Sequence, residues 1–166
     1  MGNLFSKFFG TVGVIDSIRV TLVMSFWSTL IASMLGIFLG LVLEQTKFPG
    51  KKLVVRVNRT LMGAPPVVIG LLTYMLLRKK GPFGALRWVF TIKGMVAAQV
   101  LIITPIVCGR VYSYAVRTAP SIRAFARTMG ADRHQTARLL LREMKNEIYF
   151  AVVSGYGRSI SEVGAV

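Results

Sequence analysis

The chain has 166 residues, of which 54% are hydrophobic and only 16% are charged, and its mean hydropathy is +0.61. This composition is too apolar for an ordinary water-soluble domain of the same size, so a lipid bilayer is the expected solvent. The formal net charge of +15 alone would allow a nucleic-acid partner, but the Lys and Arg residues cluster between long apolar stretches. That distribution is typical of membrane proteins with basic loops.

The first apolar stretch, over residues 18–43, predicts a transmembrane helix, because it exceeds the roughly 20 residues that cross the hydrocarbon core. Small residues recur at every fourth position within it: Ser28, Ala32, Gly36 and Gly40. Such a ridge lets a second helix approach closely, so these four are candidate helix-packing residues. The alternative is that they are simply common residues of membrane helices.

Two further spans are predicted over residues 58–78 and 94–116, and both contain proline. Pro65 and Pro66 interrupt one span and Pro105 the other. Because proline removes a backbone donor, each span is expected to be kinked or broken. Short, interrupted spans are typical of a transport path, which makes Pro65 and Pro66 candidate path residues. A structural kink without a transport role is the alternative.

The region 120–146 is amphipathic and rich in arginine, which predicts two short helices on a membrane surface or against a partner. Gly130 is expected to end the first helix in the left-handed conformation. Asp132 is expected to cap the second helix, with Gln135 in the position of a capping box. The predicted turn between the helices is Gly130, Ala131 and Asp132.

A fourth apolar segment begins at residue 148, and the sequence ends at Val166, so we expect an incomplete span over 148–166. It contains polar side chains that are costly in lipid, namely Arg158, Ser159, Ser161 and Glu162. Arg158 and Glu162 stand four residues apart and are expected to pair. Either these side chains lie beside a polar path, or the pair is a static ion pair between helices.

The basic loops indicate an orientation. The loop after the first span lies on the same side as the amphipathic region, and the positive-inside rule makes that side cytoplasmic; its basic residues are Lys47, Lys51, Lys52, Arg56 and Arg59. The opposite loop is also basic, with Arg78, Lys79, Lys80, Arg87 and Lys93. Attraction of an anionic substrate is one explanation for this second cluster.

The sequence does not predict an enzyme. It contains no glycine-rich phosphate loop followed by Lys and Ser or Thr, so no nucleotide site is expected. Its six acidic residues are scattered, which leaves no carboxylate pair and no nucleophile with a base. Cys108 and His134 are the only residues of their types. We therefore expect no catalytic residues, metal site or cofactor.

Several segments resemble ABC importer permeases, and in particular the tungstate and molybdate branch of oxyanion importers. These segments are 48–51 (FPGK), 61–68 (LMGAPPVV) and 157–165 (GRSISEVGA). The turn at Gly130 resembles the coupling loop of such permeases, in which a glycine follows a glutamate-alanine-alanine triplet. At the triplet positions this chain instead has Ala124, Phe125 and Ala126, and Glu143 stands where many members have proline.

The resemblance implies an all-α, polytopic transmembrane bundle of the type I importer class, with a cytoplasmic amphipathic coupling helix, as one domain over 1–166. It also implies a homodimer in a prokaryotic inner membrane, a separate cytoplasmic ATPase and an extracytoplasmic binding protein that delivers the oxyanion, most simply tungstate. ATPase coupling would fall to Ala126, Gly130, Ala131 and Asp132. The translocation path would include Pro65, Pro66, Arg158, Ser159, Ser161 and Glu162. Similar permeases continue with another helix, so a truncated product is expected.

Two other classes remain open. One is a basic membrane scaffold that holds anionic lipid and transports nothing. The other is a helix-turn-helix DNA-binding module over residues 122–144, which would dissolve without detergent and bind duplex DNA with a steep salt dependence. A permease should instead fractionate with membranes and occur beside genes for an ATPase and a binding protein.

Overall fold

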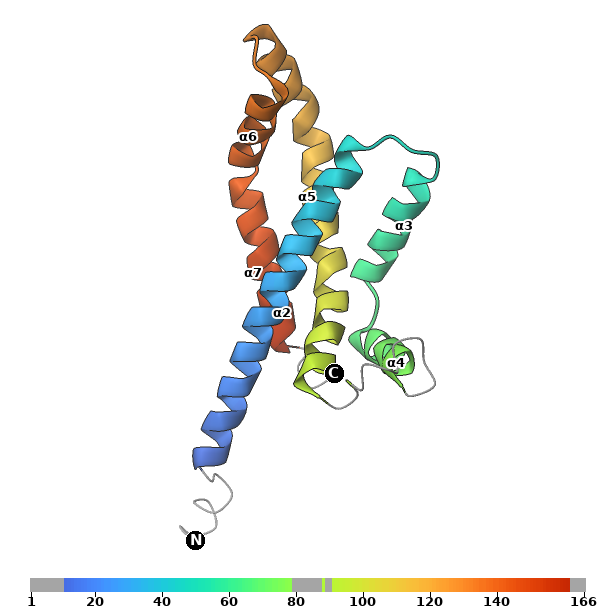
Figure 1. The fold of residues 1–166 in the computed structure, drawn as a ribbon, viewed down its shortest axis with the longest axis vertical. Helices are drawn as coiled ribbons and strands as arrows, with labels where there is room; N and C mark the ends of the chain where they lie inside the picture. The colour runs from blue at the N-terminus through green and yellow to red at the C-terminus, as the bar shows by residue number, and fades with distance from the viewer. Residues whose placement is uncertain (1–10, 79–87, 89–90, 162–166) are drawn as a thin grey trace.

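The computed structural model describes residues 11–78, 88 and 91–161. The described part contains six helices: α2 (Thr11–Gln45), α3 (Lys51–Met62), α4 (Pro66–Leu77), α5 (Ile92–Thr128), α6 (Arg133–Glu143) and α7 (Lys145–Ser161). The predicted all-α class is therefore confirmed. Helices α2 and α5 run in the same direction, and the chain turns at the far end of α5 and returns through α6 and α7 (Figure 1).

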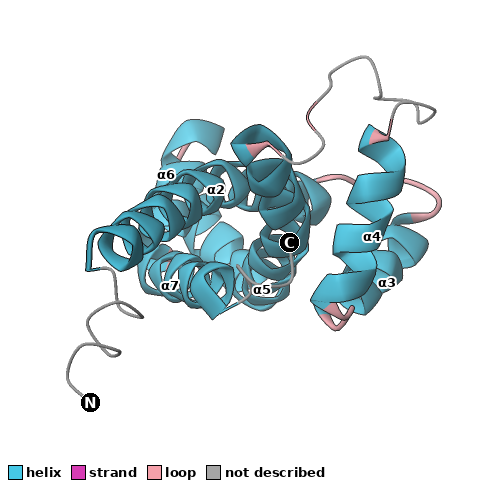
Figure 2. Ribbon diagram, turned by 90° about the horizontal axis from the view of Figure 1, so that it is seen from below, coloured by secondary structure: helices cyan, strands magenta, loops and turns pink. Residues whose placement is uncertain are grey.

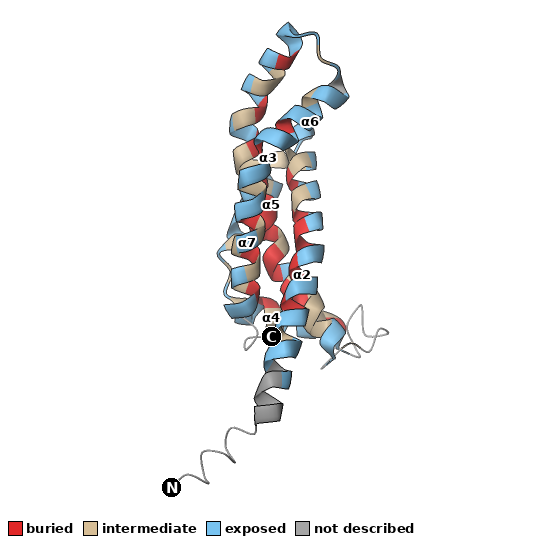
Figure 3. Cartoon of the chain, turned by 90° about the vertical axis from the view of Figure 1, so that its left-hand side faces the viewer, coloured by how far each residue is buried: buried red, intermediate tan, exposed pale blue. Residues whose placement is uncertain are grey.

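Among the described residues, two helices are long and apolar enough to cross a membrane, Ile18–Gln45 within α2 and Ile92–Thr128. The side chains of α2 are arranged for lipid, because large apolar residues such as Trp27, Met34 and Phe38 are exposed while its small residues are buried. Buried positions form a stripe through the interior of the helices (Figure 3). The expected multi-span membrane architecture is thus supported by helix length and by this inverted burial pattern.

The small-residue ridge of α2 lies against α5. Ser28, Ala32, Gly36 and Gly40 are all buried. A Cβ atom added at Gly36 would lie 2.7 Å from Val107 Cβ. One added at Gly40 would lie 3.0 Å from the backbone oxygen of Cys108. Hydrogen is therefore the only side chain that fits at these two positions without movement of α5.

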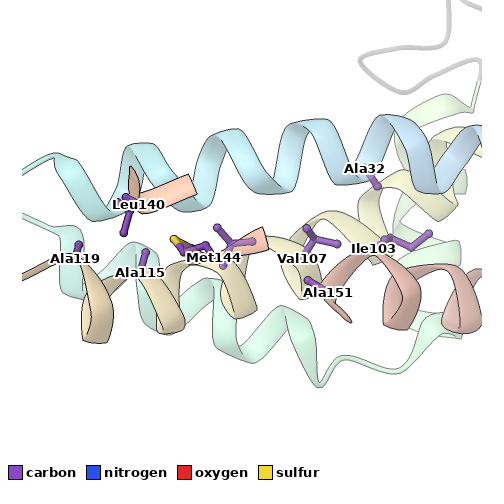
Figure 4. Packing of buried hydrophobic residues seen from close by; sticks show 9 residues of the cluster. Ala32, Ile103, Val107, Ala115, Ala119, Leu140, Met144 and Ala151 are labelled. Atoms are coloured by element: carbon purple, nitrogen blue, oxygen red, sulfur yellow. The ribbon is translucent and has the colours of Figure 1, made fainter. Parts of the chain in front are cut away.

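The core continues from this contact toward α6 and α7. Figure 4 shows Ala32 of α2 facing Ile103 and Val107 of α5, with Ala151 of α7 beside them. Farther along, Leu140 and Met144 belong to the same buried cluster, together with Ala115 and Ala119 of α5. Small residues on one helix thus alternate with branched residues on its neighbour, which allows close packing in the absence of a hydrophobic drive between lipid-embedded helices.

The segment around Pro65 and Pro66 is broken into two helices. Pro65 has an extended backbone (φ −60°, ψ 133°) and Pro66 begins α4, because a residue before proline is disfavoured in helical geometry and proline fits the first helical position. The axes of α3 and α4 differ by 110°, so the pair is either one broken span or a re-entrant segment. At 12 residues each, the helices are only about 18 Å long, less than a bilayer core.

Two details of the predicted organisation were wrong. Residues Lys51, Lys52, Arg56 and Arg59 were assigned to a loop, but they lie on α3. The density of positive charge suggested a loop. Helix α3 is instead amphipathic, with its basic residues along one stripe and apolar residues along another.

The first of the two short helices expected in 120–146 is also not separate. It is the end of α5, which continues through Pro105 and Pro120. Polar side chains bind carbonyl groups near the first proline: Thr104 Oγ1 donates to the Val100 carbonyl, and Asn58 Nδ2 donates to the Pro105 carbonyl at 3.1 Å. The Asn58 bond also ties α3 to α5 beside this proline.

The α2–α5 contact yields a test with a matched control. Gly36→Ala should destabilise the protein by about 1–3 kcal/mol, because the added methyl group overlaps Val107. The thermal unfolding midpoint in detergent should fall by roughly 2–10 °C. Gly157→Ala makes the same change on α7, where an added Cβ meets nothing within 4 Å, and should leave the midpoint unchanged or slightly raised. Equal midpoints for the two variants would contradict this account of the contact.

Candidate transport and coupling sites

The turn between α5 and α6 projects from one end of the molecule (Figure 1) and is rigidly constructed. Gly130 has a φ of 67°, in the left-handed region that glycine tolerates best. The Ala131 N–H donates to the Ala126 carbonyl at 2.9 Å and the Gly130 N–H donates to the Arg127 carbonyl at 3.1 Å. Together these bonds form a Schellman motif, which satisfies carbonyl groups at the end of α5.

The start of α6 is held from the other side of the turn. Asp132 is the N-cap residue and Gln135 occupies the N3 position of a capping box. The Asp132 N–H donates to Gln135 Oε1 at 3.0 Å. Both helix ends are thus closed within a turn of a few residues, which gives the loop one conformation.

The residues expected to couple to an ATPase differ in accessibility. Asp132 and Gly130 are exposed, and Ala131 is half-buried. Ala126 is buried, so its part in the turn is to supply the carbonyl that Ala131 binds. Two large apolar side chains near the turn are exposed, Phe125 at 59% and Met129 at 70%. An exposed apolar tip on an otherwise polar, arginine-rich end is a feature of partner contact surfaces.

An ion pair that the sequence analysis missed ties this end to α2. Arg123 donates two hydrogen bonds to Glu44, from Nη1 to Oε1 at 2.9 Å and from Nη2 to Oε2 at 2.6 Å. The Glu44 side chain is only 7% exposed. Beside the pair is a hollow of about 610 Å³, lined in part by Arg127, Ala131 and Leu140. The signal in the sequence was Glu44 itself, an acidic residue at the end of a span in a strongly basic chain.

A second cluster, the polar seam, is formed by Ser28 of α2, Gln99 of α5 and Ser159 of α7. Ser28 Oγ donates to Gln99 Oε1 at 2.7 Å and lies 3.2 Å from Ser159 Oγ. Because a hydroxyl has one proton, Ser159 is the donor in the second bond. All three side chains are buried. Gln99 was missed by the sequence analysis, although it was a single amide in an apolar run.

More hydroxyl groups line α2 near the seam. Ser25, Thr29 and Ser33 are buried, and their oxygen atoms have no hydrogen-bond partner among the residues that the structure describes. Unsatisfied hydroxyl groups are costly in an apolar interior. This stretch of α2 can therefore supply donors to a polar species or to water.

The other predicted path residues lie on two different sides of α5. Ser161 is exposed at the end of α7, where its Oγ donates to the Arg158 carbonyl at 3.0 Å, and Arg158 is half-buried. The expected Arg158–Glu162 pair falls outside the described residues, because Glu162 is not among them. Pro65 and Pro66 lie at the α3–α4 bend, on the side of α5 away from α7 (Figure 2). One copy of the chain therefore does not bring the two parts of the predicted path together.

Within residues 11–78, 88 and 91–161, no group of three or more His, Cys, Asp or Glu side chains is placed to hold a metal ion. The chemistry available in the described part is hydrogen bonding by hydroxyl and amide groups together with positive charge. Such groups can bind and release an anion without any covalent step.

Comparison with known proteins gives the family. The model of the binding-protein-dependent transport system inner membrane component matches residues 32–164. The chain is 35% identical over 139 residues to the tungstate uptake system permease protein TupB of Peptoclostridium acidaminophilum, covering 84% of this chain and 61% of that protein.

Two further relatives give the same result. A probable anion ABC transporter permease protein of Haloferax volcanii is 34% identical over 148 residues, covering 89% of this chain and 63% of that protein. The sulfate transport system permease protein CysW of Synechococcus elongatus is 28% identical over 169 residues, covering 98% and 59%. The chain thus spans about three fifths of the length of these relatives. The resemblance seen in the motifs is confirmed, and the chain belongs to the family of binding-protein-dependent transport system inner membrane components.

Proposed function

We propose that this chain forms the membrane-spanning permease part of an ATP-driven importer for a small oxyanion, with tungstate as the preferred substrate. The observation that carries the proposal is the closed Gly130 turn at one end of a membrane-length helix, in a chain of this family. ATP hydrolysis belongs to a separate cytoplasmic subunit, and a binding protein delivers the anion outside. Two copies of the permease enclose the path.

The turn is suited to transmit motion from an ATPase. Helix α5 continues from the turn without interruption for 37 residues, a length of roughly 55 Å. A displacement of the turn therefore moves the part of α5 that contains Gln99. The Arg123–Glu44 ion pair makes α2 move with it. Rigid helices joined by such contacts are the physical means by which two distant sites are coupled.

The polar seam is the part of the interior best suited to a hydrated anion. Its neutral hydroxyl and amide groups can donate hydrogen bonds, and they do not add a fixed buried charge that would hold the anion too tightly. In a homodimer, the Pro65–Pro66 bend and the Arg158–Ser161 segment would approach each other across the subunit interface. We propose tungstate as the substrate, in preference to molybdate or sulfate, because the 35% identical relative is named for tungstate uptake.

The DNA-binding alternative is less consistent with the geometry. Its first helix would be the last part of α5, which is continuous with a helix long and apolar enough to cross a membrane. The lipid-binding scaffold would transport nothing, so a transport assay distinguishes it from a permease.

The direct test uses cells, or right-side-out membrane vesicles loaded with ATP, that contain this chain, its ATPase and its binding protein. We expect ATP-dependent accumulation of tungstate that is lost when the ATPase lacks its phosphate-loop lysine. Molybdate and sulfate should compete more weakly than tungstate. A chain that inserts in the membrane and associates with the ATPase but supports no ATP-dependent uptake would support the scaffold class.

The coupling turn is tested by changing its backbone. Gly130→Val places a β-branched residue at φ 67°, which costs roughly 1–2 kcal/mol or more. Co-purification of the ATPase should fall about ten-fold, whereas Gly130→Asn, which tolerates this conformation, should retain most of it. Gly50→Val is the control, because Gly50 also has a positive φ, of 98°, in a different turn. Normal ATPase association of Gly130→Val would rule out this turn as the contact.

The ion pair is tested by a charge exchange. Arg123→Glu should reduce uptake several-fold at an unchanged protein level, because it places two carboxylates together at the α2–α5 contact. Combining it with Glu44→Arg should restore uptake. Arg127→Glu is the matched control, since Arg127 lines the same hollow but has no carboxylate partner in the part of the chain that is described. Equal losses for Arg123→Glu and Arg127→Glu would show that the pair itself is unimportant.

A further inference from the structure

A strongly basic hollow lies where α2 leads into α3. It has a volume of about 680 Å³, and its ten lining residues include five basic ones and none that is acidic. We call it the basic hollow; its charged residues are Lys47, Lys51, Lys52, Arg56 and Arg59. The proposed transport function assigns no role to it.

Four of these five side chains have no hydrogen-bond or ion-pair partner in the described part of the chain. Lys51 Nζ donates to the Glu44 and Thr46 carbonyls, both at 3.1 Å. For the remaining lysine and arginine side chains of the basic hollow, no hydrogen bond or ion pair is formed among the described residues. The nearest acidic residue along the chain, Glu44, is already bound to Arg123. The positive charge of the basic hollow is therefore uncompensated.

The direction of α3 makes this arrangement more costly. Lys51 and Lys52 lie in its first turn, where the positive end of the helix dipole disfavours cations. Arg59 lies roughly 12 Å farther along the helix axis, toward the α4 end of the bundle and away from the turn that follows α2 (Figure 1). A charged side chain that lies deeper in a membrane is costly unless an anion or water is within reach.

An apolar stripe runs beside the basic one on the same helix. Leu53, Val57 and Leu61 are spaced four residues apart and are 65%, 49% and 41% exposed. Phe48, which lines the basic hollow, is 40% exposed. A ligand that fits both stripes has an anionic group and an apolar chain joined together.

The end of α2 places the basic hollow at the correct depth for such a ligand. The candidate span Ile18–Gln45 has 28 residues, about 42 Å, which is longer than the hydrocarbon core of roughly 30 Å. Its end and the following turn therefore reach the level of the lipid headgroups. Basic hollows between membrane helices at that level are suited to the phosphate groups of anionic lipids.

We propose that the basic hollow is a binding site for an anionic phospholipid, with the headgroup phosphate between Lys47, Lys52 and Arg56 and an acyl chain along the Leu53–Val57–Leu61 stripe. The phosphate supplies the negative charge that the chain itself lacks here. The bound lipid would hold α3 beside the end of α2.

The test measures bound lipid on the purified full chain by native mass spectrometry after exchange into mixed micelles. Phosphatidylglycerol should bind at a defined stoichiometry and phosphatidylcholine should not. A Lys47→Gln, Lys52→Gln, Arg56→Gln variant should bind phosphatidylglycerol at least about ten-fold more weakly, since each basic residue near an anionic surface contributes a factor of about five. Lys47→Arg with Lys52→Arg should retain binding, which would show that positive charge at these positions is what the lipid requires, and the Gln triple variant should keep the thermal unfolding midpoint of the unchanged chain.

The matched control removes three charges elsewhere, by Arg117→Gln, Arg138→Gln and Arg142→Gln, at positions that are also exposed. It should leave phosphatidylglycerol binding within about two-fold. If both triple variants weaken phosphatidylglycerol binding equally, the lipid is held by diffuse attraction to positive charge. The basic hollow is then not a specific site. Displacement of the lipid by millimolar inorganic phosphate or tungstate would identify a free oxyanion as the ligand. If the basic-hollow triple variant binds lipid normally but no longer associates with the ATPase, the basic hollow is a protein contact. Displacement by a free oxyanion and this result would each overturn the proposal.

Discussion

The close approach of α2 and α5 organises the bundle. Gly36 and Gly40 bring the α2 backbone against Val107, Val111 and Cys108 of α5. In lipid, helices gain little from hiding apolar surface, so intimate packing and buried hydrogen bonds must hold them together. That contact allows Ser28 to reach Gln99 and Glu44 to reach Arg123, two interactions on either side of the glycines. It also leaves the large apolar side chains of α2 facing outward.

Polar groups are distributed along the bundle according to their charge. Neutral hydroxyl and amide groups occupy the interior seam, where hydrogen bonds among Ser28, Gln99 and Ser159 offset the loss of water. Among the charged groups, Arg123 is paired with Glu44 near one end, and five lysine and arginine side chains gather in the basic hollow. This separation suits a protein that must admit an anion without trapping it. In the proposed importer, the ATPase contact and the lipid contact would use different surfaces near the same end of the molecule.

Much of the architecture was predictable because its causes are local. Spacing of small residues depends only on helix periodicity, and all four predicted positions are buried. Gly130 and the Asp132–Gln135 cap follow from backbone preferences within a few residues, and the structure has both features. The Pro65–Pro66 break is local for the same reason.

The remaining features depend on distant partners. Proline normally interrupts a helix, but α5 continues past Pro105, whose carbonyl binds Asn58, 47 residues away in sequence. The Arg123–Glu44 pair joins positions 79 residues apart, and Ser28 and Ser159 are 131 apart. Composition alone made the basic part of α3 resemble a loop, because a helix with exposed charges and a loop both carry lysine and arginine. Such contacts are set by the tertiary fold and have no local signature.

The proposed coupling requires the α5–α6 turn to lie on the cytoplasmic side of the membrane, which site-directed labelling can determine. Cys108 is the only cysteine and is buried, so a Cys108→Ala, Arg138→Cys variant carries a single reporter on exposed α6. The account predicts that a membrane-impermeant maleimide labels inside-out vesicles and leaves right-side-out vesicles unlabelled until they are permeabilised. Labelling of intact right-side-out vesicles would place the turn outside the cell, where no ATPase can reach it, and would contradict the proposed coupling.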